Sequence, residues 1–220
     1  NAAPAFERRA VLVLCADNGV VAQGVSQTDA AVTRAVLENL VARRTSVCRM
    51  AAAARCAVVP VDMGIVGAPV AGAADYRIAP GTCDFTAGPA MTRAQAVQAI
   101  AAGLALVRAQ KRAGVQLLAT GEMGIGNTTT SSAVASVLLG RPVAEMTGRG
   151  AGLSDAGLRR KIEVIERGIA VNRPDAADPL GVLAALGGFD IAGLCGVFLG
   201  GALEQIPIVM DGFISSVAAL

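Results

Sequence analysis

The chain of 220 residues is long enough to bury one good core, and 54% hydrophobic residues with 26 glycines are typical of an α/β enzyme and exclude a disordered chain. The formal net charge of +2 is small and scattered, and the chain has no Trp and one Tyr, so neither charge nor stacking argues for a nucleic-acid partner. We expect a single α/β domain over residues 1–220.

The absence of histidine narrows the chemistry further. It removes Ser-His-Asp and Cys-His nucleophile systems and the usual zinc sites, so no metal is predicted and acid–base work falls to Asp, Glu, Lys or Tyr. The five cysteines form no C-x-x-C pair, which indicates reduced thiols in a cytoplasmic protein, with a disulfide as the alternative. The most apolar stretch, 191–203, is shorter than the roughly 20 residues of a bilayer span, so no membrane segment is predicted.

The first strand is predicted at residues 10–14 (AVLVL), a fully apolar run of the type found in buried parallel strands. An Asp-Asn-Gly sequence (17–19) follows at its carboxyl end, the edge where open parallel sheets bind ligands. Ordinary turn chemistry uses the same residues, so the two interpretations stay open here.

Thr28 or Asp29 is placed to cap a helix over about 28–54, which the Thr-Ser pair at 45–46 could interrupt. The second strand is predicted at 57–61 (AVVPV), where Pro60 indicates an end or edge position.

Residues 66–91 are rich in Gly, Pro and Ala and lack a helical period, which predicts a loop. Arg77 and Asp84 in this loop could contact a ligand, but a solvated loop is the simpler interpretation. The sequence at 92–95 is a capping box that predicts a helix ending near residue 113, with Gly114 as its stop.

A strand–turn–helix sequence is predicted at 115–139, with the strand at 115–119 and the helix starting at Asn127 or Thr128. Between them the glycines of GEMGIG let the backbone approach a ligand, and the N–H groups of a helix start suit a phosphate. An ordinary strand–helix turn is the alternative. A carboxylate repels an anion, so we expect Glu122 to face an uncharged or cationic part of the ligand.

A short strand is predicted at 141–146, and a second glycine-rich turn follows at 147–155. Ser154 is a plausible N-cap for a helix that runs to about residue 172. Lys161 lies beside the apolar stripe of that helix, where it either leans towards the ligand edge of the sheet or extends to water.

The third glycine turn, at 187–190, places Asp190 to cap a helix over 191–205. The fourth strand is predicted at 206–210 (IPIVM), and the next helix is expected to open at Ser215 and Ser216. Strand after strand thus ends in an acid close to glycine: Asp17, Asp62, Glu122 and Asp211. Four such acids on one edge of a parallel sheet predict a lined cleft.

Five segments occur in the order CADNGV (15–20), GEMGIGNTT (121–129), GRGAGL (148–153), GGFDIAGLCG (187–196) and DGFISSVAAL (211–220). Together they closely resemble the nicotinate-nucleotide–dimethylbenzimidazole phosphoribosyltransferase family. The resemblance implies a Rossmann-like, mostly parallel sheet with helices on both faces, and a small helical domain that is largely missing here. It also implies a homodimer without cofactors, whose partners are nicotinate mononucleotide and a benzimidazole-type base.

The resemblance assigns site residues one by one. Glu122 matches a carboxylate of the active site, and Lys161 a lysine near it. The walls that hold phosphate and ribose correspond to Gly124, Asn127, Thr128, Gly148 and Gly150. The positions around the nucleotide correspond to Asp190, Asp211, Gly212, Phe213 and Ser215. Thr28 and Val36 match the base pocket, where Val36 departs from the glutamine of some members, which leaves the acceptor base open.

Both ends of the chain look cut, and family members extend further at each end. The family's catalytic base is a glutamate beyond the DGFISS segment, so we expect it outside these 220 residues. An inactive relative that binds nucleotide or base without transfer is therefore the alternative function. A nicotinamide-dependent oxidoreductase is disfavoured, because no G-x-G-x-x-G follows the first strand.

Overall fold

The computed structural model describes residues 6–220, which form a five-stranded, all-parallel sheet in the order β3-β2-β1-β4-β5. The strands are β1 (Arg9–Ala16), β2 (Cys56–Gly64), β3 (Ala74–Asp75), β4 (Leu117–Met123) and β5 (Ile208–Val209). Strand β1 lies at the centre and pairs along its length with β2 and β4, which explains its unbroken apolar sequence. The predicted parallel sheet is confirmed.

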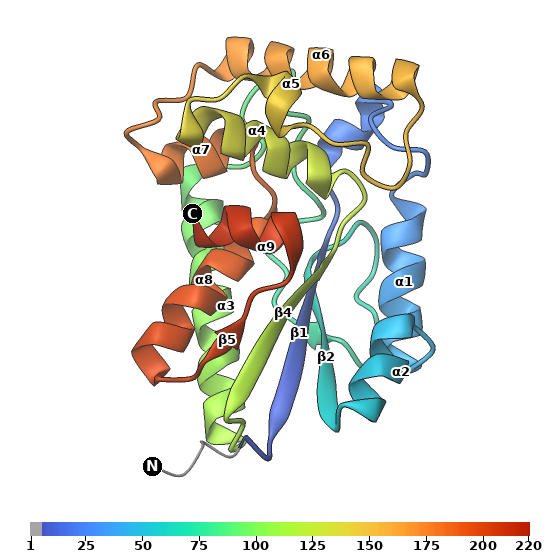
Figure 1. Cartoon of the computed structure of the whole chain (residues 1–220), viewed down its shortest axis with the longest axis vertical. Coiled ribbons are helices and arrows are strands. Elements are labelled where there is room, and N and C mark those ends of the chain that lie inside the picture. The colour runs from blue at the N-terminus through green and yellow to red at the C-terminus, as the bar shows by residue number, and fades with distance from the viewer. Residues whose placement is uncertain (1–5) are drawn as a thin grey trace.

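Nine α-helices and one short 3₁₀ helix surround the sheet in the described part of the chain (Figure 1). They are the 3₁₀ helix η1 (Gly19–Gln23), α1 (Ala31–Val41), α2 (Ser46–Ala53), α3 (Arg93–Arg112), α4 (Asn127–Leu139), α5 (Val143–Met146), α6 (Asp155–Asn172), α7 (Pro179–Leu186), α8 (Phe189–Glu204) and α9 (Gly212–Ala219). No helix within residues 6–220 is long and apolar enough to cross a membrane.

The helices cover both faces of the sheet, as predicted. Leu12 and Leu14 of β1 point to one face and pack with apolar side chains of α3 and α8. Val13 and Cys15 point to the other face and pack with α1 and α2, because successive strand residues alternate between faces. A third apolar cluster joins α4, α6 and α7 above the carboxyl ends of the strands (Figure 1).

Helices α3 and α8 pack closely because glycines stand at their contact. A Cβ on Gly103 would overlap the carbonyl oxygen of Gly193, and one on Gly196 would overlap that of Ile100. The glycines of the GGFDIAGLCG segment thus serve helix packing as well as a turn.

Several local predictions are confirmed in detail. The helix expected over 28–54 is broken in two, and Thr45 caps the second part by accepting the N–H of Cys48. The capping box at 92–95 opens α3, and Gly114 follows that helix with φ +80°. Pro60 pairs only with β1, because β3 begins to pair with β2 at Val61, so its edge position is also confirmed.

Other local predictions are wrong. Within residues 141–146, where a strand was predicted, Val143–Met146 form the short helix α5. Helix α1 starts after Ala30 without a side-chain cap, although Asp29 accepts the N–H of Ala31. Gly188 occupies the N-cap position of α8, and Asp190 lies inside its first turn.

The predicted loop at 66–91 contains the two-residue strand β3 but is otherwise irregular. It is not a simple solvated loop, since Phe85 is fully buried against Gly168 of α6. Helix α7 was not predicted at all, because its short apolar sequence carries no helical period.

Candidate active site

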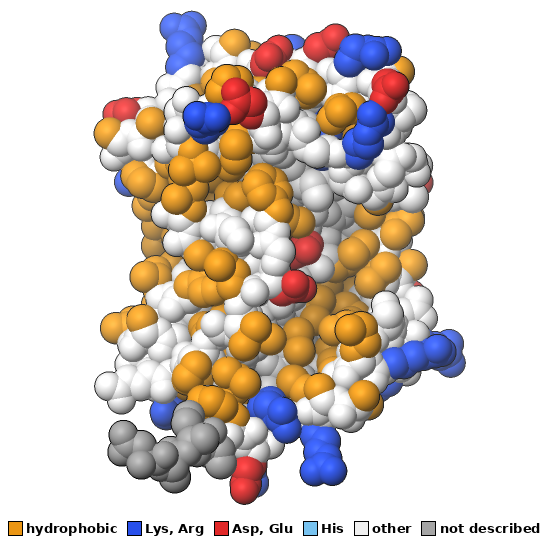
Figure 2. Space-filling model, in the orientation of Figure 1, with side chains coloured by type: hydrophobic (Ala, Val, Ile, Leu, Met, Phe, Trp, Pro, Cys, Tyr) orange, Lys and Arg blue, Asp and Glu red, His pale blue; other side chains and the backbone are white. Residues whose placement is uncertain are grey.

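A cavity of about 200 Å³ opens at the carboxyl end of β4. Its wall consists of the turn from Glu122 to Thr128, a segment at 25–27, the glycine-rich turn at 149–153, and Lys161 of α6. Figure 2 shows a hollow on this face with acidic side chains on its wall. The cavity therefore lies at the sheet edge where parallel α/β folds bind ligands.

Glu122 reaches this cavity from the end of β4 and is held by Asn127, whose side-chain amide donates a hydrogen bond to Oε2. Burial raises the pKa of Glu122, the Asn127 hydrogen bond lowers it, and the negative charge of Asp211 raises it. Asp211 itself is exposed, and its N–H donates to Thr120 Oγ1 at 3.2 Å. Glu122 and Asp211 thus face the same end of the sheet.

Lys161 carries its amino group in a fully buried position, because the residue is 0% exposed. Its Nζ donates to Thr128 Oγ1 at 2.8 Å and to the carbonyl oxygen of Gly148 at 3.2 Å. Both acceptors are neutral, and within residues 6–220 no carboxylate forms an ion pair with this ammonium group. Burial lowers the pKa of Lys161 to about 8. The interpretation of a lysine that extends to water is therefore wrong.

The turn between β4 and α4 supplies part of the predicted cradle. Gly126 stands at the N-cap of α4 with φ +90°, a conformation that favours glycine. The N–H groups of Asn127 and Thr129 bond to the carbonyl oxygens of Gly124 and Gly126, so these two donors are already used inside the turn. An anion at this end of α4 would thus depend on the remaining donors of the cavity wall, among them Lys161.

A second cavity of about 450 Å³ adjoins the first and shares Thr128 and Gly150 with it. Gly148 and Phe213 lie on its wall. A Cβ on Gly150 would stand 3.1 Å from Thr128 Oγ1 and 3.6 Å from Lys161 Nζ, so the glycine-rich turn closes tightly over the lysine. Residues from four distant parts of the sequence therefore meet at one place, as predicted.

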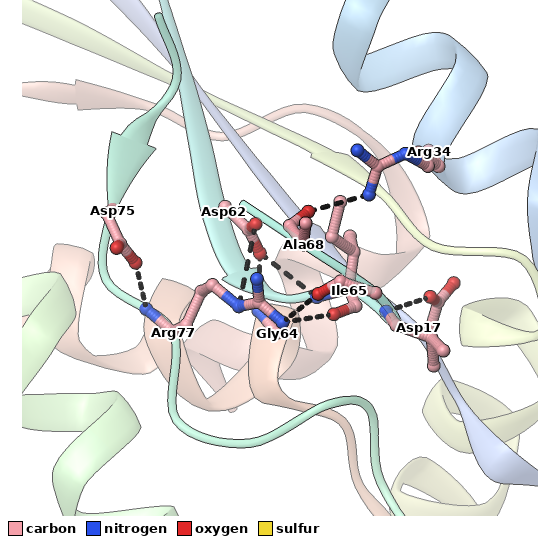
Figure 3. Close-up of polar contacts among 10 residues, drawn as sticks. Asp17, Arg34, Asp62, Gly64, Ile65, Ala68, Asp75 and Arg77 are labelled. Atoms are coloured by element: carbon pink, nitrogen blue, oxygen red, sulfur yellow. Dashed lines mark hydrogen bonds and ion pairs between the residues drawn. The ribbon is translucent and has the colours of Figure 1, made fainter. Parts of the chain in front are cut away.

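The predicted cleft lined by four acids is only partly correct, since Asp17 and Asp62 are buried beneath the loop that follows β2 (Figure 3). Asp17 Oδ2 accepts the N–H of Val66 at 2.7 Å. Asp62 Oδ1 accepts two backbone N–H groups, and its Oδ2 lies 3.8 Å from Arg77 Nε. Arg77 also donates to the carbonyl oxygen of Ile65 at 2.8 Å. These acids therefore fix the loop and do not line the cavity.

Five other predicted site residues line neither cavity, and nor does Asp211. Asp190 is completely buried, and Ser215 is 1% exposed with its Oγ bonded to Thr120 Oγ1 at 3.0 Å. Thr28 is exposed, and Val36 packs into the apolar cluster between β1 and α1. Gly212 has φ +73° and opens helix α9. The base-pocket role of Thr28 and Val36 remains a prediction.

Arg149 also lines the first cavity and was missed by the sequence reasoning. It donates to the carbonyl oxygen of Leu153 at 2.9 Å and forms an ion pair with Asp155. The feature of the sequence that could have indicated Arg149 is its place inside the GRGAGL segment. Within residues 6–220 no group of three or more Cys, Asp or Glu side chains could hold a metal ion.

Comparison with known proteins agrees with this geometry. A family model described as phosphoribosyltransferase matches residues 1–220. The chain is 47% identical over 220 residues to the nicotinate-nucleotide–dimethylbenzimidazole phosphoribosyltransferase of Ruminiclostridium cellulolyticum, covering 99% of this chain and 62% of that protein. It is also 47% identical to the protein of that name from Roseiflexus sp., covering 100% of this chain and 63% of that protein.

The solved structures agree as well. The crystal structure of CobT from Thermus thermophilus superposes with a TM-score of 0.93 at 40% identity, covering 98% of this chain and 65% of that chain. The chain thus spans less than two thirds of the length of these relatives. With the whole sequence matched and the fold shared, the chain belongs to the nicotinate-nucleotide–dimethylbenzimidazole phosphoribosyltransferase family.

Proposed function

We propose that this chain is the core of an enzyme that transfers the phosphoribosyl group of nicotinate mononucleotide to 5,6-dimethylbenzimidazole or a related base. The products are α-ribazole 5′-phosphate and nicotinate, for the lower ligand of cobalamin. The observation that carries this proposal is the fully buried Lys161 on the cavity wall, which has only neutral oxygens as partners. A buried ammonium group is costly unless an anion joins it, and the 5′-phosphate of the nucleotide is such an anion.

The chemistry assigns a separate task to Glu122. When the bond between C1′ and the pyridine nitrogen breaks, its electron pair leaves with nicotinate, and positive charge develops on C1′ and the ring oxygen. A carboxylate beside C1′ stabilises this charge, as in glycoside hydrolysis. The lone pair of a benzimidazole nitrogen then bonds to C1′ from the opposite face, which inverts the anomeric centre. The proton on the other ring nitrogen leaves to a base.

We infer that this base is a glutamate that lies after the DGFISS segment in the sequences of family members. The support is the resemblance alone, and the matched segment covers 62% of the Ruminiclostridium protein. An assay of the 220 residues beside a protein extended to the length of its relatives tests this assignment. Equal turnover by both would show that the base lies within the chain described here.

Substitution of Glu122 by Gln tests the proposed function. Gln keeps the size and an acceptor for Asn127, so the fold should persist, while turnover should fall by a factor on the order of 10². The exposed Glu163→Gln on α6 is the matched control. The assay follows the formation of α-ribazole 5′-phosphate by chromatography, with the active wild-type protein as the positive control. Unchanged turnover in Glu122→Gln would remove Glu122 from the mechanism.

The second candidate is a relative that binds nucleotide or base without transfer, the alternative that the sequence left open. Calorimetry distinguishes the two, because tight binding of nicotinate mononucleotide without product would support this candidate. Failure to bind the nucleotide at all would reject both candidates.

We propose further that the protein acts as a homodimer in the cytoplasm. The support for a dimer is the exposure of three apolar side chains at the end of α8 and on β5, which are Leu199, Leu203 and Val209. Apolar patches of this kind mark association surfaces. Sedimentation velocity of the wild type and of Leu203→Glu tests it, and a wild type that remains a monomer at assay concentrations would reject it.

A further inference from the structure

Asp190 was expected to lie around the bound nucleotide, but the structure gives it a different place. It is the second residue of α8, is 0% exposed, and lines neither of the two cavities. A bound ligand at this site would therefore not touch it. Its effect on a ligand must pass through another side chain.

Asn127 is that side chain, since it connects Asp190 to the cavity. Its Nδ2 donates to Asp190 Oδ2 at 3.0 Å and also donates to Glu122 Oε2. An amide NH₂ has two hydrogens to donate, and each of the two carboxyl groups offers an oxygen that accepts, so the two neighbours fix the orientation of the amide. Asn127 thus donates one hydrogen to the buried Asp190 and the other to Glu122, which faces the cavity.

The structure also fixes Asp190 itself. Its Oδ1 accepts the N–H of Ile191 at 3.0 Å. Two glycines leave the space that its carboxyl group fills: a Cβ on Gly124 would stand 2.9 Å from Oδ2, and one on Gly188 would overlap Oδ1. An alanine at either glycine would therefore collide with the carboxyl group of Asp190.

The charge that shifts the pKa of Asp190 is that of another carboxylate. It belongs to Glu122 of β4, and the pKa of the Cys15 thiol on β1 is raised by Asp190 together with Asp62, Glu122 and Asp17. Asp211 adds its charge on the far side of Glu122, and Arg77 pairs with the more distant Asp62. Burial raises the pKa of Asp190 to about 7, and the charge of Glu122 raises it as well. The pair therefore resists carrying two charges, and the proton prefers the buried member.

We propose that Asp190 is a positioning residue for the reaction: it holds one hydrogen of the Asn127 amide, so that the other hydrogen fixes Glu122 at the cavity as the charged member of the pair. This role rests on the proposed function, in which Glu122 stabilises charge on the ribose. The juxtaposition of acid, amide and acid exists in the protein without a ligand, so it can be tested without turnover.

The experiment is a carboxyl-carbon NMR titration of protein labelled in Asp and Glu, without substrate, with the Glu122 signal assigned from Glu122→Gln. In Asp190→Asn the carboxyl that titrates near pH 7 should disappear, and the Glu122 signal should lose the inflection near pH 7 that the ionisation of Asp190 gives it in the wild type. The exposed Asp175→Asn should change neither signal. A folded Asp190→Asn protein in which Glu122 titrates as in the wild type would overturn the proposal.

A second variant decides the matter if Asp190→Asn does not fold. Asn127→Ala removes the bridge, and since the Asn127 hydrogen bond lowers the pKa of Glu122, that pKa should rise. A merely structural pair would show neither the inflection near pH 7 in the wild type nor this rise of the Glu122 pKa in Asn127→Ala. An unchanged pKa of Glu122 in Asn127→Ala would also overturn the proposal.

Kinetics add a separate readout. The pH profile of kcat should lose its ionisation near pH 7 in Asp190→Asn, while KM for nicotinate mononucleotide stays within about twofold, because Asp190 lines no cavity. A large change in KM with kcat unchanged would instead make Asp190 a substrate-binding residue. Absence of transferase activity in a protein extended to the length of its relatives would reject the proposed function, whereas the titration would still decide the arrangement of the three side chains.

Discussion

Binding of nicotinate mononucleotide at about pH 8 should draw a proton from solution onto Lys161. Burial lowers the pKa of Lys161 from 10.5 to about 8, so close to half of the protein carries a neutral amine at that pH. A phosphate beside the amine favours its charged form. If the pKa returns towards its ordinary value, the complex is almost fully protonated, and about half a proton is taken up per site.

The same arrangement has a cost in the unliganded protein. The pKa of Lys161 falls from 10.5 to about 8, and this difference of about 2.5 pH units corresponds to about 3 kcal/mol. The unfolded chain binds the proton more tightly, so the full cost is present below about pH 8 and disappears as the pH rises towards 10.5. Lys161→Met should therefore raise the free energy of unfolding at pH 7, and its advantage over the wild type should shrink above pH 8.

Isothermal titration calorimetry in two buffers of different ionisation enthalpy measures the proton uptake. Lys161→Met should abolish the uptake and weaken nucleotide binding by a factor of about 10 to 100, the value of a charge-assisted hydrogen bond. Lys111→Met, which removes the chain's other lysine from an exposed position at the end of α3, is the matched control. Tight binding at pH 8 without proton uptake, or the same uptake in Lys161→Met, would refute the reasoning.

Two further predictions concern the scaffold and the thiols. Gly103→Ala should lower the free energy of unfolding by about 3 kcal/mol, because its Cβ would overlap the backbone of Gly193. The control is Gly88→Ala, where a Cβ meets nothing within 4 Å. Equal denaturation midpoints for the two variants would contradict the packing argument. A thiol reagent should modify the exposed Cys83 quickly and Cys15 only on unfolding, since burial and nearby carboxylates raise the pKa of the Cys15 thiol. A fast phase of thiol modification that survives in Cys83→Ser would contradict this prediction.

Much of the fold followed from the sequence because its signals are local. The apolar run of β1 is typical of a central parallel strand, and the capping box at 92–95 opens a helix wherever the helix packs. Pro60 carried information of the same kind, since a residue without an N–H is tolerated where a strand has no neighbour on one side. The resemblance of the ordered motifs then indicated the family.

The site was less determined by sequence, because a side chain's neighbours across the fold decide its state. In the sequence, Asp62 and Glu122 look alike, because each is an acid at the end of a strand. In the structure, backbone N–H groups that follow Asp62 bond to its carboxylate, while Glu122 remains on a cavity wall.

By itself, the sequence determined a parallel α/β sheet, the edge of the sheet at which the cavity opens, and the family to which the chain belongs. Only the tertiary structure decided that Lys161 is buried against Thr128 and Gly148, and that Asp190 reaches the site through Asn127. Strand and helix signals arise from neighbouring residues, whereas burial and charge pairing arise between residues far apart in the chain.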